Sequence, residues 1–340
     1  MDYPKWFWLS DRDNFRYNLA FSGVFRCRYQ SIMSRNYLPS FLLCLLITLQ
    51  LSEQEKVKPF LPDFFAAYPQ VRDLAMDADH REMYFTIESP LKEFSVIVVS
   101  RALNGVWQAP QVAPFSGQYH DLEPFLAPDG LHLYFASDRP MTGHETNDMN
   151  IWFVSRSSWN DRWGDPRPVN APIHTDKDEF YPSVAANGNL YFTRLADDPQ
   201  QKEDIFISQA GHGGYQDPEP LPAAINGKTY EFNASIAADE SFILFTSYGR
   251  EDDLGGSDLY ISRKGDQGQW LPAEHLAGIN SNRIDYCPFV DLERHILYFT
   301  SERSDIPRRY DQPQSLQELL NQFHQPAHGA GRIYFTEFRP

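Results

Sequence analysis

The stretch DLEPFLAPDGLHLYFASDR, from Asp121 to Arg139, decides the fold of this chain. It places two runs rich in apolar residues on either side of a Pro-Asp-Gly sequence. Asp-Gly readily adopts the positive φ angles that a tight hairpin requires. The stretch therefore predicts two antiparallel strands joined by a short turn, with a polar Ser-Asp-Arg sequence at the end of the second strand.

The same pattern occurs five times along the chain. A pair of large residues in the middle of the second predicted strand recurs at separations of 50, 57, 53 and 54 residues. The five pairs are Tyr84-Phe85, Tyr134-Phe135, Tyr191-Phe192, Leu244-Phe245 and Tyr298-Phe299. Self-similarity at a nearly constant interval indicates a repeat architecture.

Two further strands complete each repeat. The third opens with NIW, DIF, DLY or RIY, and the fourth follows an aromatic residue and a proline. Proline is tolerated in an outer edge strand, where its missing N–H breaks no ladder. Four antiparallel strands in every 50 to 57 residues predict an all-β chain folded as a β-propeller.

The motif P-(S/F)-x-A-x-(D/N)-G-x-LYF-x-S-(D/E)-R, followed by (D/N)-(I/L)-(Y/W), resembles the TolB-type, WD40-like β-propeller repeat of extracytoplasmic bacterial proteins. The resemblance covers roughly residues 60–340. It implies a propeller without TolB's separate N-terminal domain, a location at the cell envelope and binding to other proteins. The first copy, AMDADHREMYFTIES, departs most because it lacks the glycine and the arginine.

Five copies favour five blades, with six, as in TolB, as the alternative. The expected blades span residues 67–118, 119–173, 174–225, 226–279 and 280–340, the last completed by 57–66. Pro59–Phe64 resembles Pro110–Phe115 of the first copy, so we expect it to pair with the third strand of blade five around Ile333–Phe335. An N-terminal strand placed there closes the ring and removes open sheet edges.

The N-terminal region is expected to be removed. Phe41–Leu51 is an apolar run of 11 residues, too short to cross a bilayer as a helix. With Met33 and Arg35 before it, the run indicates a signal peptide over 33–52, preceded by an upstream extension over 1–32. A buried helix of the fold is the alternative. Residues 53–340 would form one periplasmic or secreted domain with no stable membrane span and a single cysteine, Cys287.

An insertion over 304–331 interrupts the last repeat. Ser315 and Glu318 form a capping-box pattern, and Leu316, Leu319, Leu320 and Phe323 recur at helical spacing. The pattern predicts a short amphipathic helix that either packs on the propeller or contacts a partner.

Composition and motifs exclude several functions. The formal net charge of −16 makes nucleic acid an implausible partner, because phosphate binding needs a basic surface. The chain has no GxSxG nucleophile elbow, HExxH zinc helix or phosphate-binding GxxxxGK[ST] loop. These absences favour a binding protein over an enzyme.

One set of acidic residues is a candidate site. An acid precedes each predicted first strand, aligned through DLA, DLEP, EFYP, EFNA and DYCP: Asp73, Asp121, Glu179, Glu231 and Asp285. The residues expected to flank them are Tyr119, His120, Phe180, Phe232 and Tyr286. First strands are innermost in a propeller, so the five carboxylates are predicted to ring one mouth of the central channel.

Two interpretations of this acidic ring remain open. The acids could hold blades together by accepting hydrogen bonds from backbone N–H groups or from a neighbouring blade's arginine, namely Arg139, Arg194, Arg250 or Arg303. Alternatively, since like charges placed close together repel, the ring could bind a basic ligand or a cation, with Ca²⁺ the first candidate.

The sequence thus predicts a monomeric binding or scaffolding module of the cell envelope, with an envelope protein or a small ligand such as a glycan as its partner. The alternative is a carbohydrate- or lactone-processing propeller hydrolase with a cation at the channel mouth.

Overall fold

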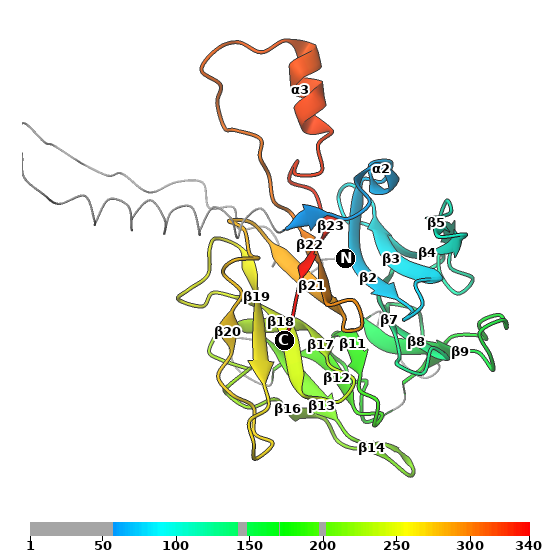
Figure 1. Cartoon of the computed structure of the whole chain (residues 1–340). Coiled ribbons are helices and arrows are strands. Elements are labelled where there is room, and N and C mark those ends of the chain that lie inside the picture. Colours follow the sequence, from blue (N-terminus) through cyan, green and yellow to red (C-terminus); the bar gives the residue numbers. More distant parts are fainter. Residues whose placement is uncertain (1–56, 142–147, 170, 197–201) are drawn as a thin grey trace, which may run out of the picture. The chain divides into compact units, whose positions relative to one another are not determined.

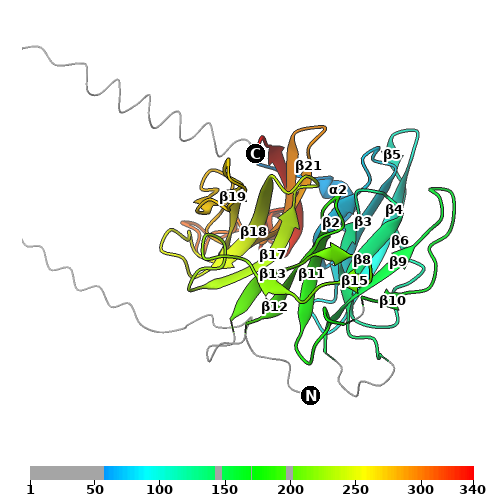
Figure 2. The same ribbon diagram turned by 90° about the horizontal axis from the view of Figure 1, so that it is seen from below.

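The computed structural model describes residues 57–141, 148–169, 171–196 and 202–340. These residues form five antiparallel sheets arranged as the blades of a β-propeller (Figures 1 and 2). The predicted all-β, five-bladed propeller is confirmed. The predicted extension over 1–32 and signal peptide over 33–52 lie outside the described residues.

Each blade runs from an inner first strand to a short outer fourth strand. The first strands are β2 (Gln70–Met76), β7 (Asp121–Leu126), β11 (Glu179–Val184), β17 (Tyr230–Ile236) and β21 (Asp285–Asp291). The second strands are β3 (Glu82–Glu88), β8 (His132–Ser137), β12 (Leu190–Leu195), β18 (Phe242–Tyr248) and β22 (Ile296–Ser301). The third strands are β4 (Ser95–Leu103), β9 (Asn150–Ser155), β13 (Glu203–Ser208), β19 (Ser257–Arg263) and β23 (Arg332–Glu337).

The fourth strands have only two residues each and include several prolines: β6 (Gln111–Val112), β10 (Arg167–Pro168), β16 (Glu219–Pro220), β20 (Glu274–His275) and β1 (Lys58–Pro59). Three further short elements lie outside this pattern: β5 (Val106–Trp107) and the pair β14 (Ala210–Gly211) and β15 (Gly214–Tyr215). Large buried side chains from adjacent blades pack together, so the hydrophobic core is divided among the spaces between blades.

The N-terminal strand closes the ring, as predicted. Lys58 and Pro59 pair with Phe335 and Tyr334 of β23, and the Phe60 N–H donates to the Ile333 carbonyl at 2.9 Å. The Phe60 ring then packs on Tyr298 at 4.9 Å between ring centroids. A following turn of helix, α2 (Pro62–Phe65), buries Phe65 against blade 1. The outer edge of blade five is therefore paired and covered.

All five first strands contain a β-bulge at the same place, which the sequence analysis did not predict. The pairing with the second strand shifts after Arg72, Leu122, Phe180, Phe232 and Tyr286. The next residue in each strand has a positive φ between 47° and 60°: Asp73, Glu123, Tyr181, Asn233 and Cys287. A bulge inserts an extra residue and re-aims its side chain. In this propeller, the bulge determines which residue of each first strand reaches the propeller axis.

The turn between the first two strands also has a left-handed residue in every blade. Gly130 and Gly188 take this place in blades 2 and 3, and His80 takes it in blade 1 with φ of 54°. The Asp77 carboxylate stabilises the turn without glycine by accepting from the Arg81 and Glu82 N–H groups. The first copy therefore keeps the hairpin despite its divergent sequence.

The insertion in the last blade contains the predicted helix, α3 (Leu316–Phe323), with both hydrogen bonds of the Ser315–Glu318 capping box present. None of its residues is buried, and it projects from the propeller in Figure 1. The expectation that it packs on the propeller is therefore wrong for its apolar side. Among the described residues, no helix has the length and hydropathy needed to span a membrane.

Candidate functional site

The strand-start acid of blade 2 is enclosed by donors. Asp121 is fully buried, and its carboxylate accepts from Arg139 at 2.6 Å, Ser137 at 2.6 Å and Ser116 at 2.8 Å. The Arg139 guanidinium also donates to the Phe115 carbonyl, in the segment that enters blade 2. The acid thus fixes the connection between two blades. The arginine comes from its own blade, so the predicted source in a neighbouring blade is wrong.

Blades 4 and 5 repeat this arrangement. The fully buried Glu231 accepts from Arg250 at 3.0 Å, and Asp285 accepts from Arg303 at 3.0 Å. Ser281 also donates to Asp285 through both its N–H and its hydroxyl group. A buried carboxylate needs a paired charge and further hydrogen bonds to offset its desolvation, and both are present here.

Blade 3 has the acid at the same place, but its arginine lies at a different position. Glu179 is fully buried and accepts from the Thr175 hydroxyl at 2.6 Å. Arg194 stands directly opposite Glu179 in the strand pairing, where blades 2, 4 and 5 have serine, and its guanidinium lies over the Phe206 ring at 4.3 Å. Burial raises the pKa of Glu179 to about 8. Desolvation favours the protonated carboxyl.

The first member of the predicted ring does not share this register. Asp73 occupies the bulge position, two residues beyond the strand-start place, which Val71 takes in blade 1. Val71 is fully buried and pairs with Ile87. The prediction of five acids in one register is therefore wrong for Asp73. The sequence alignment placed Asp73 with the strand-start acids, whereas in the strand pairing Asp73 corresponds to the bulge residues of the other blades.

The bulge residues meet at the propeller axis in a cluster that we call the axial cluster: Arg72, Asp73, Glu123, Tyr181, Asn233 and Cys287. Arg72 donates to Asp73 at 2.8 Å, to Glu123 at 2.8 Å and to the Cys287 sulfur at 3.5 Å. Asn233 of blade 4 donates to Glu123 of blade 2 at 3.3 Å. Contacts between blades that are not neighbours show that the cluster fills the axis.

Glu123 also compensates for a missing hydroxyl. In three blade pairs, the N–H of the bulge residue donates to a threonine of the preceding blade: Asp73 to Thr300, Glu123 to Thr86 and Asn233 to Thr193. Blade 2 has Ala136 at the threonine position, and the Tyr181 N–H donates instead to Glu123 at 2.7 Å. Burial raises the pKa of Glu123 to about 8, despite the opposing effect of Arg72.

The five predicted flanking residues divide into two groups. Tyr119 lies under the Arg139 guanidinium, and His120 Nδ1 is 2.8 Å from the Ser95 hydroxyl. Phe180, Phe232 and Tyr286 take the register of Arg72, immediately before the bulge. Arg72 stacks over the Tyr286 ring at 5.2 Å. Tyr286 therefore belongs to the surroundings of the axial cluster, which the sequence analysis missed.

The ring does not form one cation site. Each of its four remaining members is held by separate donors, and Asp73 is bonded to Arg72. Within the described ranges, no group of three or more His, Cys, Asp or Glu side chains is arranged to hold a metal ion. The residues present thus do not fit a shared Ca²⁺, and the geometry favours the interpretation that the acids hold the blades together.

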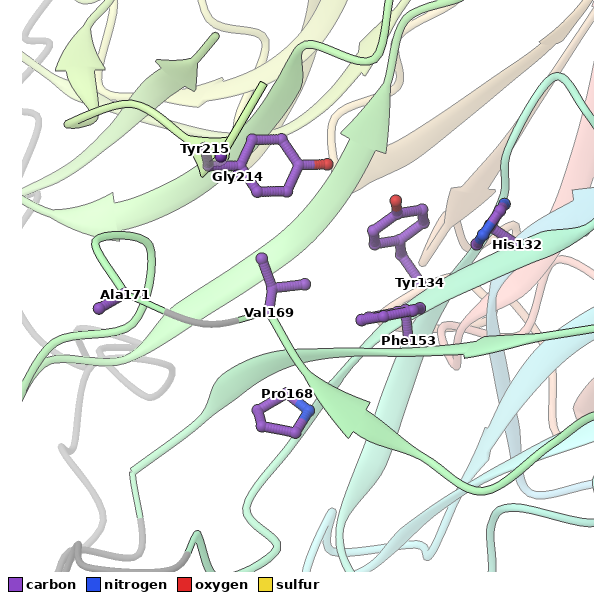
Figure 3. A pocket seen from close by; sticks show the side chains of 9 residues that line it. His132, Tyr134, Phe153, Pro168, Val169, Ala171, Gly214 and Tyr215 are labelled. Atoms are coloured by element: carbon purple, nitrogen blue, oxygen red, sulfur yellow. The ribbon is translucent and has the colours of Figure 1, made fainter. Parts of the chain in front are cut away.

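A cavity of about 310 Å³ lies away from the axis, between blades 2 and 3 (Figure 3). Its walls come from β8, β9 and β10 of blade 2 and from the β14–β15 hairpin of blade 3. The lining is mainly aromatic and apolar: His132, Tyr134, Phe153, Pro168, Val169, Ala171, Gly213, Gly214 and Tyr215. No sequence pattern indicated this cavity, because its two walls are about 40 residues or more apart along the chain.

No known protein family and no curated protein matches this sequence. Solved structures with a similar fold include one named "putative TolB" from Agrobacterium tumefaciens, with 14% identity, 79% of this chain and 91% of that chain covered, and a TM-score of 0.46. An endo-arabinase from Bacteroides thetaiotaomicron has 14% identity, coverages of 80% and 95%, and a TM-score of 0.49. A GH43 endo-arabinanase from Bacillus licheniformis has 10% identity, coverages of 79% and 94%, and a TM-score of 0.45. Similarity at this level assigns no activity.

Proposed function

We propose that this propeller is an extracytoplasmic scaffolding module that binds a protein partner, as the resemblance to TolB-type repeats implies. The observation that carries the proposal is the exposed apolar side of α3. Leu316, Leu320 and Phe323 lie at helical spacing, with 72%, 37% and 47% of their surfaces exposed. The complete capping box gives the helix a defined structure although none of its residues is buried. Leu319 of the same apolar set is half-buried, and the rest of the stripe is exposed; an ordered, exposed apolar stripe is a feature of interaction surfaces.

Other exposed apolar residues lie on the same face of the propeller. We call this the loop face, because it carries the connections between second and third strands. Leu91 and Phe94 belong to that connection in blade 1, and Tyr248 and Leu254 lie at or within it in blade 4. Blades 4, 5 and 1 are consecutive around the closed ring. The proposed docking surface is therefore one continuous arc with α3 at its centre.

The hydrogen bonding of the acids supports a binding role over a catalytic one. A general acid or base must reach a substrate. Asp121, Glu231 and Asp285 are each fully buried and bonded to an arginine, and Glu179 is fully buried and bonded to Thr175. Their arrangement is that of groups serving the fold.

Capture of the partner by the full chain, expressed in its native cells, tests this function. The triple variant Leu316→Ser, Leu320→Ser, Phe323→Ser should lose the captured partner and keep the wild-type melting temperature, since it removes no buried side chain. Leu103→Ser, Val106→Ser, Leu292→Ser is the matched control, because these side chains are also exposed but lie in connections of the opposite face. Equal capture by both triple variants would reject the docking surface.

The alternative, a carbohydrate- or lactone-processing hydrolase, would need a general acid that reaches a substrate. Burial raises the pKa of Glu123 to about 8, but this residue is also buried, and its carboxylate accepts from Arg72 and the Tyr181 N–H. The alternative therefore has less support than the scaffold. Chromogenic glycosides and lactones, assayed with the wild type and Glu123→Gln, test this. Turnover abolished by Glu123→Gln would favour the hydrolase over the scaffold.

A further inference from the structure

The residue that follows the fourth strand differs between the cavity at blades 2 and 3 and the filled groove at blades 5 and 1. Val169 follows Pro168 of β10, and its N–H donates to the Ile151 carbonyl at 2.9 Å. At the equivalent place in blade 5, Phe60 follows Pro59 and donates to the Ile333 carbonyl at 2.9 Å. The Phe60 ring fills the groove between blades 5 and 1. The cavity between blades 2 and 3 has Val169 at this place, and blades 1, 3 and 4 have Ala113, Leu221 and Leu276.

The aromatic residues of the two grooves correspond as well. Tyr134 pairs with Phe153 across β8 and β9, as Tyr298 pairs with Phe335 across β22 and β23. Tyr298 is 3% exposed beneath Phe60, whereas Tyr134 and Phe153 are only partly buried. The ring centroids of Tyr134 and Phe153 are 5.7 Å apart at an angle of 30°, so the two rings form one continuous aromatic wall.

Two hydroxyl groups face this cavity. Figure 3 shows the hydroxyls of Tyr134 and Tyr215 directed into the space between blades 2 and 3. In other blades, the equivalent tyrosine donates to a carboxylate: Tyr84 to Glu82 at 2.9 Å and Tyr191 to Glu240 at 2.7 Å. The Tyr134 hydroxyl is instead hydrogen-bonded to the Tyr215 hydroxyl, which leaves each oxygen with further capacity to donate or accept. These groups are therefore placed to hydrogen-bond to a molecule in the cavity.

The lining selects against charge. None of its nine residues is Asp, Glu, Lys or Arg. Its one histidine, His132, has its Nδ1 atom 2.7 Å from the carboxylate of Asp129. Burial raises the pKa of both Tyr134 and Tyr215, which keeps the two hydroxyls neutral. The net charge of −16 further disfavours an anion. The geometry therefore suits a neutral ligand.

We propose that this cavity binds one neutral sugar ring. The aromatic wall, whose ring faces carry partial negative charge, attracts the C–H face of a sugar. The tyrosine hydroxyls and the imidazole can donate to and accept from its hydroxyl groups. The volume of about 310 Å³ is at the small end of ligand sites, which span about 300–1,000 Å³, so it suits one ring with its chain continuing outside. A purely apolar occupant would use none of the remaining hydrogen-bonding capacity of the paired tyrosine hydroxyls and the imidazole.

The test uses the full chain and a panel of neutral methyl glycosides, with phenol as the apolar probe, measured by titration calorimetry and saturation-transfer NMR. At least one glycoside should bind with a dissociation constant of about 10 mM or lower, and more tightly than phenol. Val169→Phe, which installs the residue found in the equivalent groove, should weaken that binding at least about tenfold.

Tyr134→Phe and Tyr215→Phe keep the fold if Val169→Phe does not, and each should weaken glycoside binding about threefold or more by removing one hydroxyl. Tyr298→Phe is the matched control and should bind as the wild type does, because its groove is filled by Phe60. The proposal is overturned if no glycoside binds, if phenol binds as tightly as the best glycoside, or if Tyr298→Phe weakens binding as much as Tyr134→Phe. Loss of partner capture through α3 leaves all these outcomes unchanged, so the two proposals fail separately.

Discussion

Blades 2 and 1 solve the same structural problem with opposite chemistry. At the start of the first strand, blade 2 has Asp121 bonded to Arg139 and Ser137. Blade 1 has Val71 facing Ile87 at the same register. Both sites are fully buried at the first-strand position. The propeller therefore tolerates either a complete ion pair or a complete apolar pair there. An acid at this position requires its arginine, and an apolar residue requires an apolar residue opposite it.

The difference arises from how each blade is joined to the preceding one. A continuous segment enters blade 2, and Arg139 ties it down through the Phe115 carbonyl. Blade 1 begins just after the strand that closes the ring, where Phe60 and Phe65 already supply buried contacts. An arginine still ties down the entering segment, but it comes from blade 5: Arg332 donates to the Tyr68 carbonyl at 3.0 Å and to the Pro69 carbonyl at 3.1 Å. The charged group of blade 1 moves instead to the axis, where Arg72 joins Asp73 and Glu123.

The largest expected effect comes from placing the acid of blade 2 in blade 1. Val71→Asp would bury a carboxylate opposite Ile87, with Ser89 at the place of Arg139 and Arg332 already bonded to the Tyr68 and Pro69 carbonyls. An unpaired buried charge costs at least about 5 kcal/mol, enough to unfold a protein of ordinary stability. Circular dichroism and chemical denaturation measure the loss. Val71→Ala, which only removes methyl groups, should cost about 2 kcal/mol. Equal stability of the two variants would contradict this account of the comparison.

Removing the arginine of blade 2 tests whether the buried acid of that blade depends on its paired charge. Arg139→Ala leaves Asp121 buried without its paired charge and should cost about 3–5 kcal/mol in the free energy of unfolding. The matched control is Arg294→Ala, which breaks a 3.0 Å pair with Asp291 whose arginine is 39% exposed. That change should cost at most about 1 kcal/mol. Similar losses at both positions would show that the Asp121 pair does not stabilise the blade.

Blade 3, where the arginine is displaced, should make stability depend on pH. The folded protein keeps a proton on Glu179 up to its pKa of about 8, whereas the unfolded chain releases it near the ordinary value. Stability should therefore be highest below the unfolded pKa and fall as pH rises through the folded one, by roughly 3 kcal/mol between pH 5 and 8.

Denaturation of the wild type, Glu179→Gln and Glu274→Gln across this range measures the effect. Glu179→Gln should make the decline shallower, because it removes one of the buried carboxyls with a raised pKa; Glu123, with a pKa of about 8, and Glu203, with a pKa of about 7, still titrate in this range. Glu274 is 68% exposed and controls for the change in net charge. If Glu179→Gln declines as steeply as the wild type, Glu179 does not carry a proton in the folded protein.

The smallest effect concerns the hydroxyl between blades. Thr86→Val removes an acceptor for the Glu123 N–H, which keeps its second acceptor at Asp73. We expect a loss of about 1 kcal/mol, measured from the midpoint of chemical denaturation. Thr246→Val is the control, since its buried hydroxyl has no hydrogen-bond partner in the described residues, and it should be neutral or slightly stabilising. A larger loss of stability for Thr246→Val than for Thr86→Val would contradict the interpretation that the Thr86 hydroxyl stabilises the contact between blades.

The sequence alone determined the blades and their closure. Hairpin turns and the periodicity of buried residues are local signals, so Tyr134-Phe135 and its four relatives identified the second strands, and five copies indicated five blades. The resemblance of Pro59–Phe64 to Pro110–Phe115 correctly predicted which strand completes the ring. The capping box at Ser315 is equally local, and the helix that it predicts is present.

Only the tertiary structure decided what the acidic residues do. The bulge follows from how each inner strand packs around the axis, and it moved Asp73 two residues out of the predicted register. The donors to Glu123 come from Arg72, Tyr181 and Asn233, on three different blades. The sugar-sized cavity likewise depends on two walls from separate blades. Repetition in the sequence specifies each blade, but charges and cavities depend on residues that only the closed ring brings together.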